Sequence, residues 1–333
     1  ADGTVWDYDY VSEHWNSVPG EGGGETIDGN EQDNSLSGTD GDDILLGYDG
    51  DDSLFGNGGN DWIEGGRGDD FLSGGAGNDT YFWSPGDGLD TVNDGENNDT
   101  IIFGEGVYAN EIKFRCINDH DLQIMVGGSN KQGIIIRDFF YGTERIYKTL
   151  QFADGSEMRL SDKGFELWQT DETEKITAGG FDDIIHAGGG DDRVNAGHGN
   201  DTIIGGRGND ILYGGEGDDV YVWNRGDGLD EIWEDAGSDT IRFGEGIAFD
   251  DLTFAYENGY LLITVDGDDT QGVKIRDFFG SQKEQYMVEK LEFADGSSFN
   301  LAESGLALTQ KNTAEQIDGT DFDDVIYGNG GSD

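Results

Sequence analysis

The sequence predicts an all-β protein in which parallel β-roll solenoid blocks alternate with antiparallel β-domains, in tandem units of about 140 residues. Three observations predict this fold. Glycine and aspartate recur with an unbroken period of nine residues, a segment of short apolar strands follows each such block, and the whole arrangement occurs twice. Fixed internal periods are typical of repeat architectures, in which each repeat stacks on its neighbours.

The composition narrows the possible partners to cations. The 333 residues include 72 Asp and Glu against 19 Lys and Arg, so the formal net charge is -53. No basic patch is available to neutralise phosphates, which argues against nucleic acid as a partner. A single cysteine, Cys116, excludes an internal disulfide. We also expect neither a membrane span nor an N-terminal signal peptide, because no long apolar run and no basic start are present.

The first nonapeptide block covers residues 38–82 and the second covers residues 178–222. Each holds five repeats such as "GGRGDDFLS" (65–73), with aspartate sixth and an apolar residue eighth. Weaker copies precede both blocks, from Gly20 and from Gln169. The register is unbroken within each block, which indicates that every repeat has the same local structure.

The nine positions have distinct physical roles. Glycines at positions one, two and four allow positive φ and close backbone approach, which a six-residue turn needs. The apolar eighth residue lies in a three-residue strand and points inward, so two repeats form one coil of about eighteen residues. Stacked turns then place an aspartate beside backbone carbonyls. An all-oxygen site without sulfur or imidazole suits Ca²⁺, so we predict several calcium ions in each roll.

Similar tails follow the two blocks, from Trp83 and from Trp223, and contain short strands separated by Gly and Asp turns. We expect each roll to give way to antiparallel strands within a few residues of Gly86 and Gly226. The ends of the sequence match parts of these units, so we expect a piece of a longer tandem array. The expected segments are 1–19 (end of a preceding unit and linker), 20–86 (roll 1), 87–168 (antiparallel domain 1), 169–226 (roll 2), 227–309 (antiparallel domain 2) and 310–333 (start of roll 3).

The nonapeptides resemble those of the RTX (repeats-in-toxin) family, and the tails look like the haemolysin-type calcium-binding related domain. The resemblance implies a β-roll in each block and a Ca²⁺ ion between turns two repeats apart, held by backbone carbonyls and two aspartates. It implies that Asp61 shares an ion with Asp79, and Asp201 with Asp219. The implied ligands are the carboxylates of Asp43, Asp52, Asp61, Asp70, Asp79, Asp183, Asp192, Asp201, Asp210 and Asp219, those of Asp324 and Asp333 in the third block, and the carbonyls of Gly66, Gly68, Gly206 and Gly208.

Some positions depart from the repeat. Phe181 replaces the fourth-position glycine, and Glu25 and Asn34 replace the sixth-position aspartate, so we expect the leading edge of each block to bind weakly or not at all. Two explanations remain open for the aspartates of the "GDGLD" motifs: they cap the roll with a further ion, or they satisfy local turn amides. These aspartates are Asp87, Asp90, Asp227 and Asp230.

The sequence contains no zinc-protease pair, nucleophile elbow or Walker loop, so we expect no catalytic site in these residues. The expected function is that of a calcium-binding repeat region of a large secreted bacterial RTX exoprotein, which folds on Ca²⁺ after export and acts as an extended extracellular scaffold or adhesin segment. The alternative is the repeat region of an RTX toxin or secreted enzyme whose active domain lies elsewhere. The expected partners are calcium ions and neighbouring repeat units of the same chain, and the resemblance also implies a type I secretion apparatus. The expected location is extracellular or on the cell surface.

Overall fold

The computed structural model describes residues 23–95, 97–141, 148–279, 288–301, 305–310 and 325–327. Its secondary structure is 53% strand and 2% helix, which confirms the all-β prediction. Among the described residues, no helix has the length and apolar character needed to cross a bilayer. The chain forms two compact units, residues 1–113 with 121–162 and residues 114–120 with 163–333.

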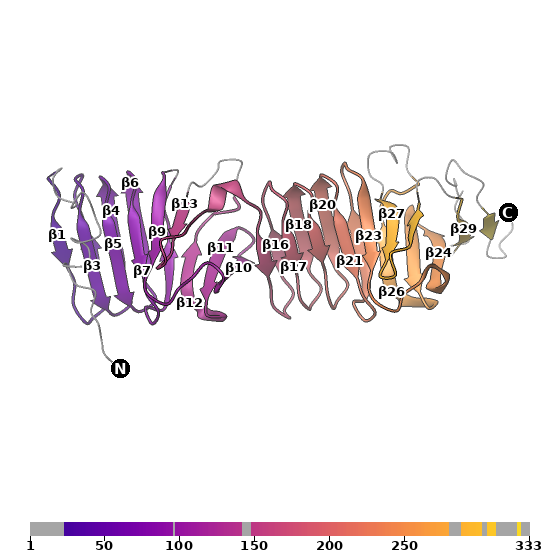
Figure 1. The fold of residues 1–333 in the computed structure, drawn as a ribbon, viewed down its shortest axis with the longest axis horizontal. Coiled ribbons are helices and arrows are strands. Elements are labelled where there is room, and N and C mark those ends of the chain that lie inside the picture. The colour runs from indigo at the N-terminus through magenta and orange to yellow at the C-terminus, as the bar shows by residue number, and fades with distance from the viewer. Residues whose placement is uncertain are drawn as a thin grey trace. The chain divides into compact units, whose positions relative to one another are not determined.

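The roll of unit 1 consists of two parallel sheets, and successive repeats alternate between them (Figure 1). Ile44 pairs with Trp62 in one sheet and Leu54 pairs with Leu72 in the other, so one coil takes eighteen residues, as predicted. The first sheet contains β1 (Thr26–Asp28), β3 (Ile44–Asp49), β5 (Trp62–Arg67), β7 (Thr80–Trp83) and β9 (Asp99–Phe103). The second contains β2 (Ser35–Ser37), β4 (Ser53–Gly58), β6 (Phe71–Ala76) and β8 (Leu89–Val92).

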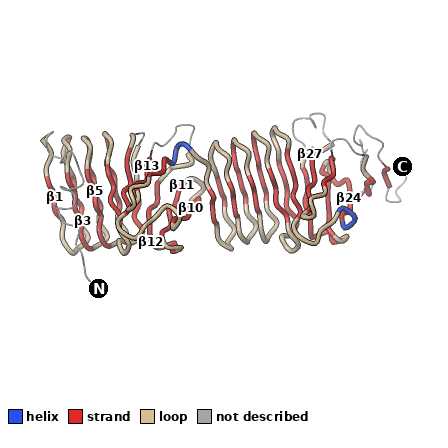
Figure 2. Tube along the Cα trace, in the orientation of Figure 1, coloured by secondary structure: helices blue, strands red, loops and turns tan. Residues whose placement is uncertain are grey.

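The core between the two sheets of this roll is a row of eighth-position side chains, and Ile44, Trp62 and Phe82 form a second buried cluster. Leu45, Leu54, Ile63, Leu72 and Tyr81 are all buried, with at most 1% of their surface exposed. Each repeat therefore contributes one such inward-facing side chain, which leaves the core narrow. Turns join the strands at both edges of the roll (Figure 2).

The turns demand glycine where their backbones touch. Gly66 has φ +94°, and a Cβ built on it would lie 1.9 Å from the carbonyl oxygen of Tyr48. Gly68 has φ +149°, and its Cβ would lie 2.0 Å from the carbonyl oxygen of Gly50. Tyr48 and Gly50 belong to the turn two repeats earlier. A side chain at Gly66 or Gly68 would therefore push stacked turns apart. Position two is not glycine in every repeat, since Tyr48 and Asn57 occupy it with positive φ.

The expectation that the roll gives way to antiparallel strands near Gly86 is wrong. Phe71 pairs in parallel with Thr91, and Thr80 with Thr100, so one further coil continues the ladder with a spacing of twenty residues. The open edges of β6 and β7 need partners for their backbone groups, and β8 and β9 supply them. The ladder continues in parallel from β8 to β12 (Ser129–Ile136) and from β9 to β13 (Lys148–Gln151). Antiparallel pairing begins only where β11 (Asp121–Val126) meets β12 and β14 (Glu157–Arg159) meets β13; the short helix η1 (Leu160–Asp162) follows.

Unit 2 repeats this plan, and its ladder likewise runs past Gly226, because Thr240 pairs in parallel with Val220. One parallel series contains β10 (Ile112–Ile117), paired through Phe114 with Leu167, then β15 (Glu166–Trp168), β17 (Ile184–His186), β19 (Thr202–Ile204), β21 (Val220–Trp223), β23 (Asp239–Phe243) and β27 (Val288–Phe293). The other contains β16 (Lys175–Thr177), β18 (Arg193–His198), β20 (Ile211–Glu216), β22 (Leu229–Trp233) and β26 (Asp268–Ile275).

The tail of unit 2 reverses its strand direction twice. β26, β25 (Tyr260–Val265) and β24 (Leu252–Glu257) form an antiparallel meander, with the helix η2 (Phe249–Asp251) before β24, and β28 (Ser298–Asn300) pairs with β27. After two reversals β24 has the direction of the roll strands again. It pairs in parallel with β29 (Ala307–Gln310), which pairs in parallel with β30 (Val325–Tyr327). Parallel strands thus resume at the outer edge of the meander. The division of the chain into six segments stays a prediction.

We predict that Gly66→Ala destabilises the calcium-loaded protein by about 2–4 kcal/mol, because left-handed strain and backbone overpacking add. Gly106→Ala should cost only about 1–2 kcal/mol, since Gly106 has φ +85° but open space around its Cβ position. Gly95 has neither constraint, and its replacement by Ala should change the free energy of unfolding by less than about 0.5 kcal/mol. Urea unfolding at millimolar Ca²⁺ measures all three. A cost for Gly66→Ala no larger than that for Gly106→Ala would contradict the proposed turn contact.

Candidate metal centres

The sixth-position aspartates form a ladder of hydrogen bonds between turns. The Oδ1 atom of Asp61 accepts the backbone N–H of Asp43 at 2.8 Å, and Oδ1 of Asp79 accepts that of Asp61 at 2.8 Å. In unit 2 the N–H of Asp201 donates to Oδ1 of Asp219 at 2.7 Å. The structure therefore places together the two predicted pairs, Asp61 with Asp79 and Asp201 with Asp219. The same bond joins Asp52 to Asp70, Asp183 to Asp201, and Asp192 to Asp210.

The second carboxylate oxygen of most ladder residues is buried and has no hydrogen-bond partner. These atoms are Oδ2 of Asp52, Asp61, Asp70, Asp79, Asp90, Asp192, Asp201, Asp210, Asp219 and Asp239. Buried polar atoms are nearly always paired, so a row of unpaired anionic oxygens indicates a missing cationic partner.

Glycine keeps space open beside these oxygens. A Cβ built on Gly47 would lie 2.3 Å from Oδ2 of Asp52 and 2.4 Å from the carbonyl oxygen of Gly65. A Cβ on Gly56 would lie 2.0 Å from Oδ2 of Asp61 and 2.7 Å from the carbonyl oxygen of Gly74. A carboxylate and a carbonyl two repeats on thus face one small space that a side chain would fill. This oxygen-only donor set fits Ca²⁺.

The four glycines predicted as carbonyl donors lie in these stacked turns. The carbonyl oxygen of Gly68 points at the following turn, where a Cβ on Gly88 would lie 1.9 Å from it. That of Gly208 would lie 1.8 Å from a Cβ on Gly228. Gly66 and Gly206 face a carbonyl oxygen of the preceding turn in the same manner. Their role as ligands stays a prediction.

The leading aspartate of each block is different, because its own turn already uses its second oxygen. Oδ2 of Asp43 accepts the N–H of Thr39 at 2.5 Å, and Oδ2 of Asp183 accepts that of Gly179 at 3.1 Å. The N–H of Asn34 donates to Oδ1 of Asp52 at 2.6 Å, so the stacking continues there without a sixth-position carboxylate. This geometry gives a physical basis for weak ion binding at the leading edges. The predicted ligands Asp324 and Asp333 lie outside the described residues.

The ladder extends beyond the nonapeptides to residues that the sequence pattern did not single out. Oδ1 of Asp99 accepts the N–H of Asp79 at 2.8 Å, and Oδ1 of Asp239 accepts that of Asp219 at 2.8 Å. The motifs "NDTII" and "SDTIR" at these positions repeat the Asp-x-apolar ending of a nonapeptide, but at a spacing of twenty residues. Because of this longer spacing, Asp99 and Asp239 fall outside the nine-residue register.

The two aspartates of each "GDGLD" motif have different environments. Oδ2 of Asp87 accepts the N–H of Ser84 at 2.6 Å, and Oδ2 of Asp227 accepts that of Asn224 at 2.6 Å, as turn residues do. Asp90 and Asp230 instead join the ladder, and their Oδ1 atoms accept the N–H groups of Asp70 at 3.2 Å and Asp210 at 3.0 Å.

Burial disfavours the ionised form of the aspartates in the ladder. Loss of hydration raises the pKa of Asp61 to about 6 and the pKa values of Asp79 and Asp201 to about 7, and neighbouring carboxylates add to the effect. The pKa values of Asp90 and Asp230 rise to about 9 for the same reason, with Asp70 and Asp210 as the nearest negative neighbours. The N–H donors oppose these shifts without cancelling them.

We predict that acid partly substitutes for calcium. The folded pKa of Asp79 is about 7 against an ordinary 3.8, so the ion-free fold binds more protons than the unfolded chain between these values. Its stability therefore rises as the pH falls from about 8 to about 5, and is lost as the pH rises through about 6–7. Far-UV circular dichroism in chelator at constant ionic strength should show β-structure increasing towards pH 5. A β signal that stays constant or decreases over this range would contradict the prediction.

Family models match both rolls and part of the second tail. The RTX calcium-binding nonapeptide repeat (4 copies) matches residues 19–54, 46–81, 168–203, 188–221, 196–229 and 312–333. The haemolysin-type calcium binding protein related domain matches residues 261–303. No curated protein matches the chain.

Three solved structures are similar to parts of the chain. The AlgE6R3 subunit of a mannuronan C5-epimerase from Azotobacter vinelandii is 30% identical, covering 36% of this chain and 78% of its own length, with a TM-score of 0.26. The AlgE6R2 subunit of the same source is 20% identical, with coverages of 34% and 83% and a TM-score of 0.28. The extracellular lipase LipA from Serratia marcescens is 16% identical, with coverages of 76% and 38% and a TM-score of 0.26.

The nonapeptide matches cover the same turns in which glycine, carbonyl and aspartate form the oxygen-lined spaces between coils. The sequence register, the strand pairing and the family models therefore agree, and the chain belongs to the RTX family of calcium-binding repeat proteins.

Proposed function

We propose that this chain is a stretch of a secreted bacterial RTX exoprotein that folds on binding Ca²⁺ outside the cell and serves there as a non-catalytic scaffold or adhesin segment. The observation that supports this proposal best is the row of buried, unpartnered Oδ2 atoms along both rolls. A fold that buries such a row depends on cations to become stable.

The chain's own groups supply what a cation needs. Each Oδ1 is held by a backbone N–H, which fixes the carboxylate and directs Oδ2 into the space between turns. Asp61 and Asp79 would hold one ion and Asp201 and Asp219 another, together with carbonyls of the same turns. Bound Ca²⁺ neutralises carboxylates that burial otherwise disfavours, so its binding free energy becomes folding free energy.

Dependence on calcium suits export. A chain with a formal net charge of -53 repels itself and stays extended where Ca²⁺ is scarce, as in a cytosol. An extended chain can pass a narrow type I secretion channel, and the higher Ca²⁺ outside then folds it. The chain's one cysteine, Cys116, is buried, so ions take the cross-linking role that disulfides have in many secreted proteins.

The tail of unit 2 supports a scaffold role. Its outer meander strand, β24, presents an edge with the direction of the roll, and β29 and β30 stack on that edge in parallel. Backbone pairing of this kind passes from one roll to the start of the next without an unpaired break. Neighbouring repeat units of the same chain are therefore the partners that we propose for each tail.

We predict that half of the β-structure forms between about 10⁻⁴ and 10⁻³ M Ca²⁺, the range of extracellular calcium modules. Limited proteolysis and tryptophan fluorescence during a Ca²⁺ titration at fixed ionic strength measure this midpoint. A midpoint at or below micromolar Ca²⁺ would mean that the chain folds before export, which would overturn the proposed extracellular switch.

Asp201→Asn and Asp218→Asn form a matched pair for the same titration. Each removes one negative charge and keeps an oxygen that accepts a backbone N–H, but Asp201 is buried in the ladder and Asp218 is an exposed fifth-position residue. The first should raise the midpoint of unit 2 by about tenfold, since it removes one ligand charge, and the second should leave it unchanged. Equal shifts would show that overall charge, not the ladder, controls folding.

A further inference from the structure

Three acidic residues converge at the last turn of the unit 2 ladder. Asp219, Glu234 and Asp239 each offer a carboxylate oxygen, and these atoms lie within 4.8 Å of one another. The three residues are buried, with 0%, 7% and 1% of their surface exposed. Glu234 lies in the tail, outside every nonapeptide, so the repeat pattern does not predict its presence here.

Carboxylate oxygens without hydrogen-bond partners line the space between these residues. Oδ2 of Asp219 and Oδ2 of Asp239 have no hydrogen-bond partner. The hydroxyl of Tyr221 donates to Oε1 of Glu234 and so fixes that carboxylate. A Cβ built on Gly214 would lie 2.3 Å from Oδ2 of Asp219, 2.5 Å from the Tyr221 hydroxyl and 2.7 Å from Oε1 of Glu234. Glycine therefore keeps open the space that these oxygens share.

A fourth carboxylate adjoins the cluster. Oε2 of Glu289, on the neighbouring strand β27, accepts the N–H of Asp239 at 2.7 Å. The two nearby basic residues, Arg242 and Lys290, both pair with Glu292 instead. In the described part of unit 2, no lysine or arginine nitrogen lies within 4.0 Å of the four carboxylates. Among the described residues, the cluster thus contains four acids and has no lysine or arginine partner.

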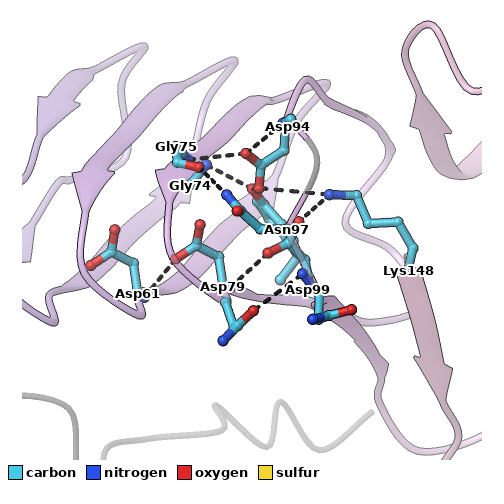
Figure 3. Close-up of polar contacts among 12 residues, drawn as sticks. Asp61, Gly74, Gly75, Asp79, Asp94, Asn97, Asp99 and Lys148 are labelled. Carbon is cyan, nitrogen blue, oxygen red and sulfur yellow. Dashed lines mark hydrogen bonds and ion pairs between the residues drawn. The ribbon is translucent and has the colours of Figure 1, made fainter. Parts of the chain in front are cut away.

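Unit 1 has the same framework with one decisive difference. Asp79, Asp94 and Asp99 occupy the equivalent positions, and the Tyr81 hydroxyl donates to Oδ2 of Asp94 at 2.5 Å. In the sequence of the tails Lys148 takes the place of Glu289. In the strand pairing Lys148 lies opposite Asp99, whereas a register shift puts Val288 opposite Asp239 and Glu289 directly after it. The ammonium of Lys148 bonds Oδ2 of Asp99 and lies 3.8 Å from Oδ2 of Asp94, with the side chains fully buried (Figure 3).

Burying several like charges without a counter-charge is strongly unfavourable. In unit 1 the ammonium of Lys148 supplies the counter-charge within the chain. We propose that in unit 2 a divalent cation supplies it: the last turn binds one further hard ion, Ca²⁺ in the natural setting, through Asp219, Glu234 and Asp239, and Lys148 occupies the place of that ion in unit 1. The inference rests on the proposed calcium-dependent folding only in taking Ca²⁺ as the available ion.

The test exchanges the two residues in the 333-residue chain and counts bound Ca²⁺ by equilibrium dialysis with metal analysis. Glu289→Lys should lower the count by one ion per chain, because an ammonium then enters the unit 2 cluster. Lys148→Glu should raise the count by one, because it recreates the four-acid arrangement in unit 1. Glu245→Lys makes the same charge change at an exposed turn of unit 2 and should leave the count unchanged.

The outcomes separate this inference from the proposed function. If both exchanged variants fold in Ca²⁺ with unaltered counts, the terminal site is wrong while calcium-dependent folding stands. If the native chain neither binds Ca²⁺ nor folds in its presence, the terminal site and the proposed function are both wrong. Should Glu289→Lys not fold, Glu234→Gln is the milder variant, since its amide oxygen still accepts from Tyr221. It should weaken one ion by about tenfold through loss of a ligand charge, and unchanged affinities of all ions would overturn the proposal.

Discussion

The structure depends on the carboxylate of the sixth-position aspartate, whose two oxygens have different roles. Oδ1 of each sixth-position aspartate accepts a backbone N–H from the turn eighteen residues earlier, as Asp79 does for Asp61. Except in the leading residues Asp43 and Asp183, Oδ2 of the block aspartates is thereby held in a buried space and accepts no hydrogen bond within the described protein. The first bond fixes the stacking of the turns, and the second oxygen makes that stacking conditional on a cation. The cation site needs the Oδ1 hydrogen bond, because a carboxylate without it would rotate and turn Oδ2 towards water.

The remaining features follow from this division. Tyr48 and Gly66 come into contact because coils bridged through their turns must stack closely, and only glycine permits that distance. The narrow core of single residues such as Leu45 and Ile63 suffices because ions share the work of holding the coils together. Where the repeats end, the chain closes the last turn in two ways: Lys148 neutralises acids internally in unit 1, and the acids of unit 2 are left for an ion.

The sequence predicted the roll well because its register is local. Nine-residue spacing alone places Asp70 on a turn and Leu72 in the core, as the structure shows. It failed at the end of the roll, since Asp99 continues the ladder after a coil of twenty residues, outside that register. Lys148 could not be assigned either. It meets Asp99 only through the parallel pairing of β9 with β13, and no periodicity joins residues 49 positions apart.

The most direct test of the calcium-bridged ladder compares three conditions at one ionic strength: chelator, millimolar Ca²⁺ and millimolar Mg²⁺. Hydrodynamic radius and far-UV circular dichroism are measured in each at a pH of about 7.5, above the raised aspartate pKa values near 6 to 7. The account predicts an expanded chain with little β-structure in chelator, a compact β-rich chain in Ca²⁺, and little response to Mg²⁺, which keeps its waters and demands a tighter octahedron. A native-like radius and β signal in chelator would contradict it, even if calcium ions bind afterwards.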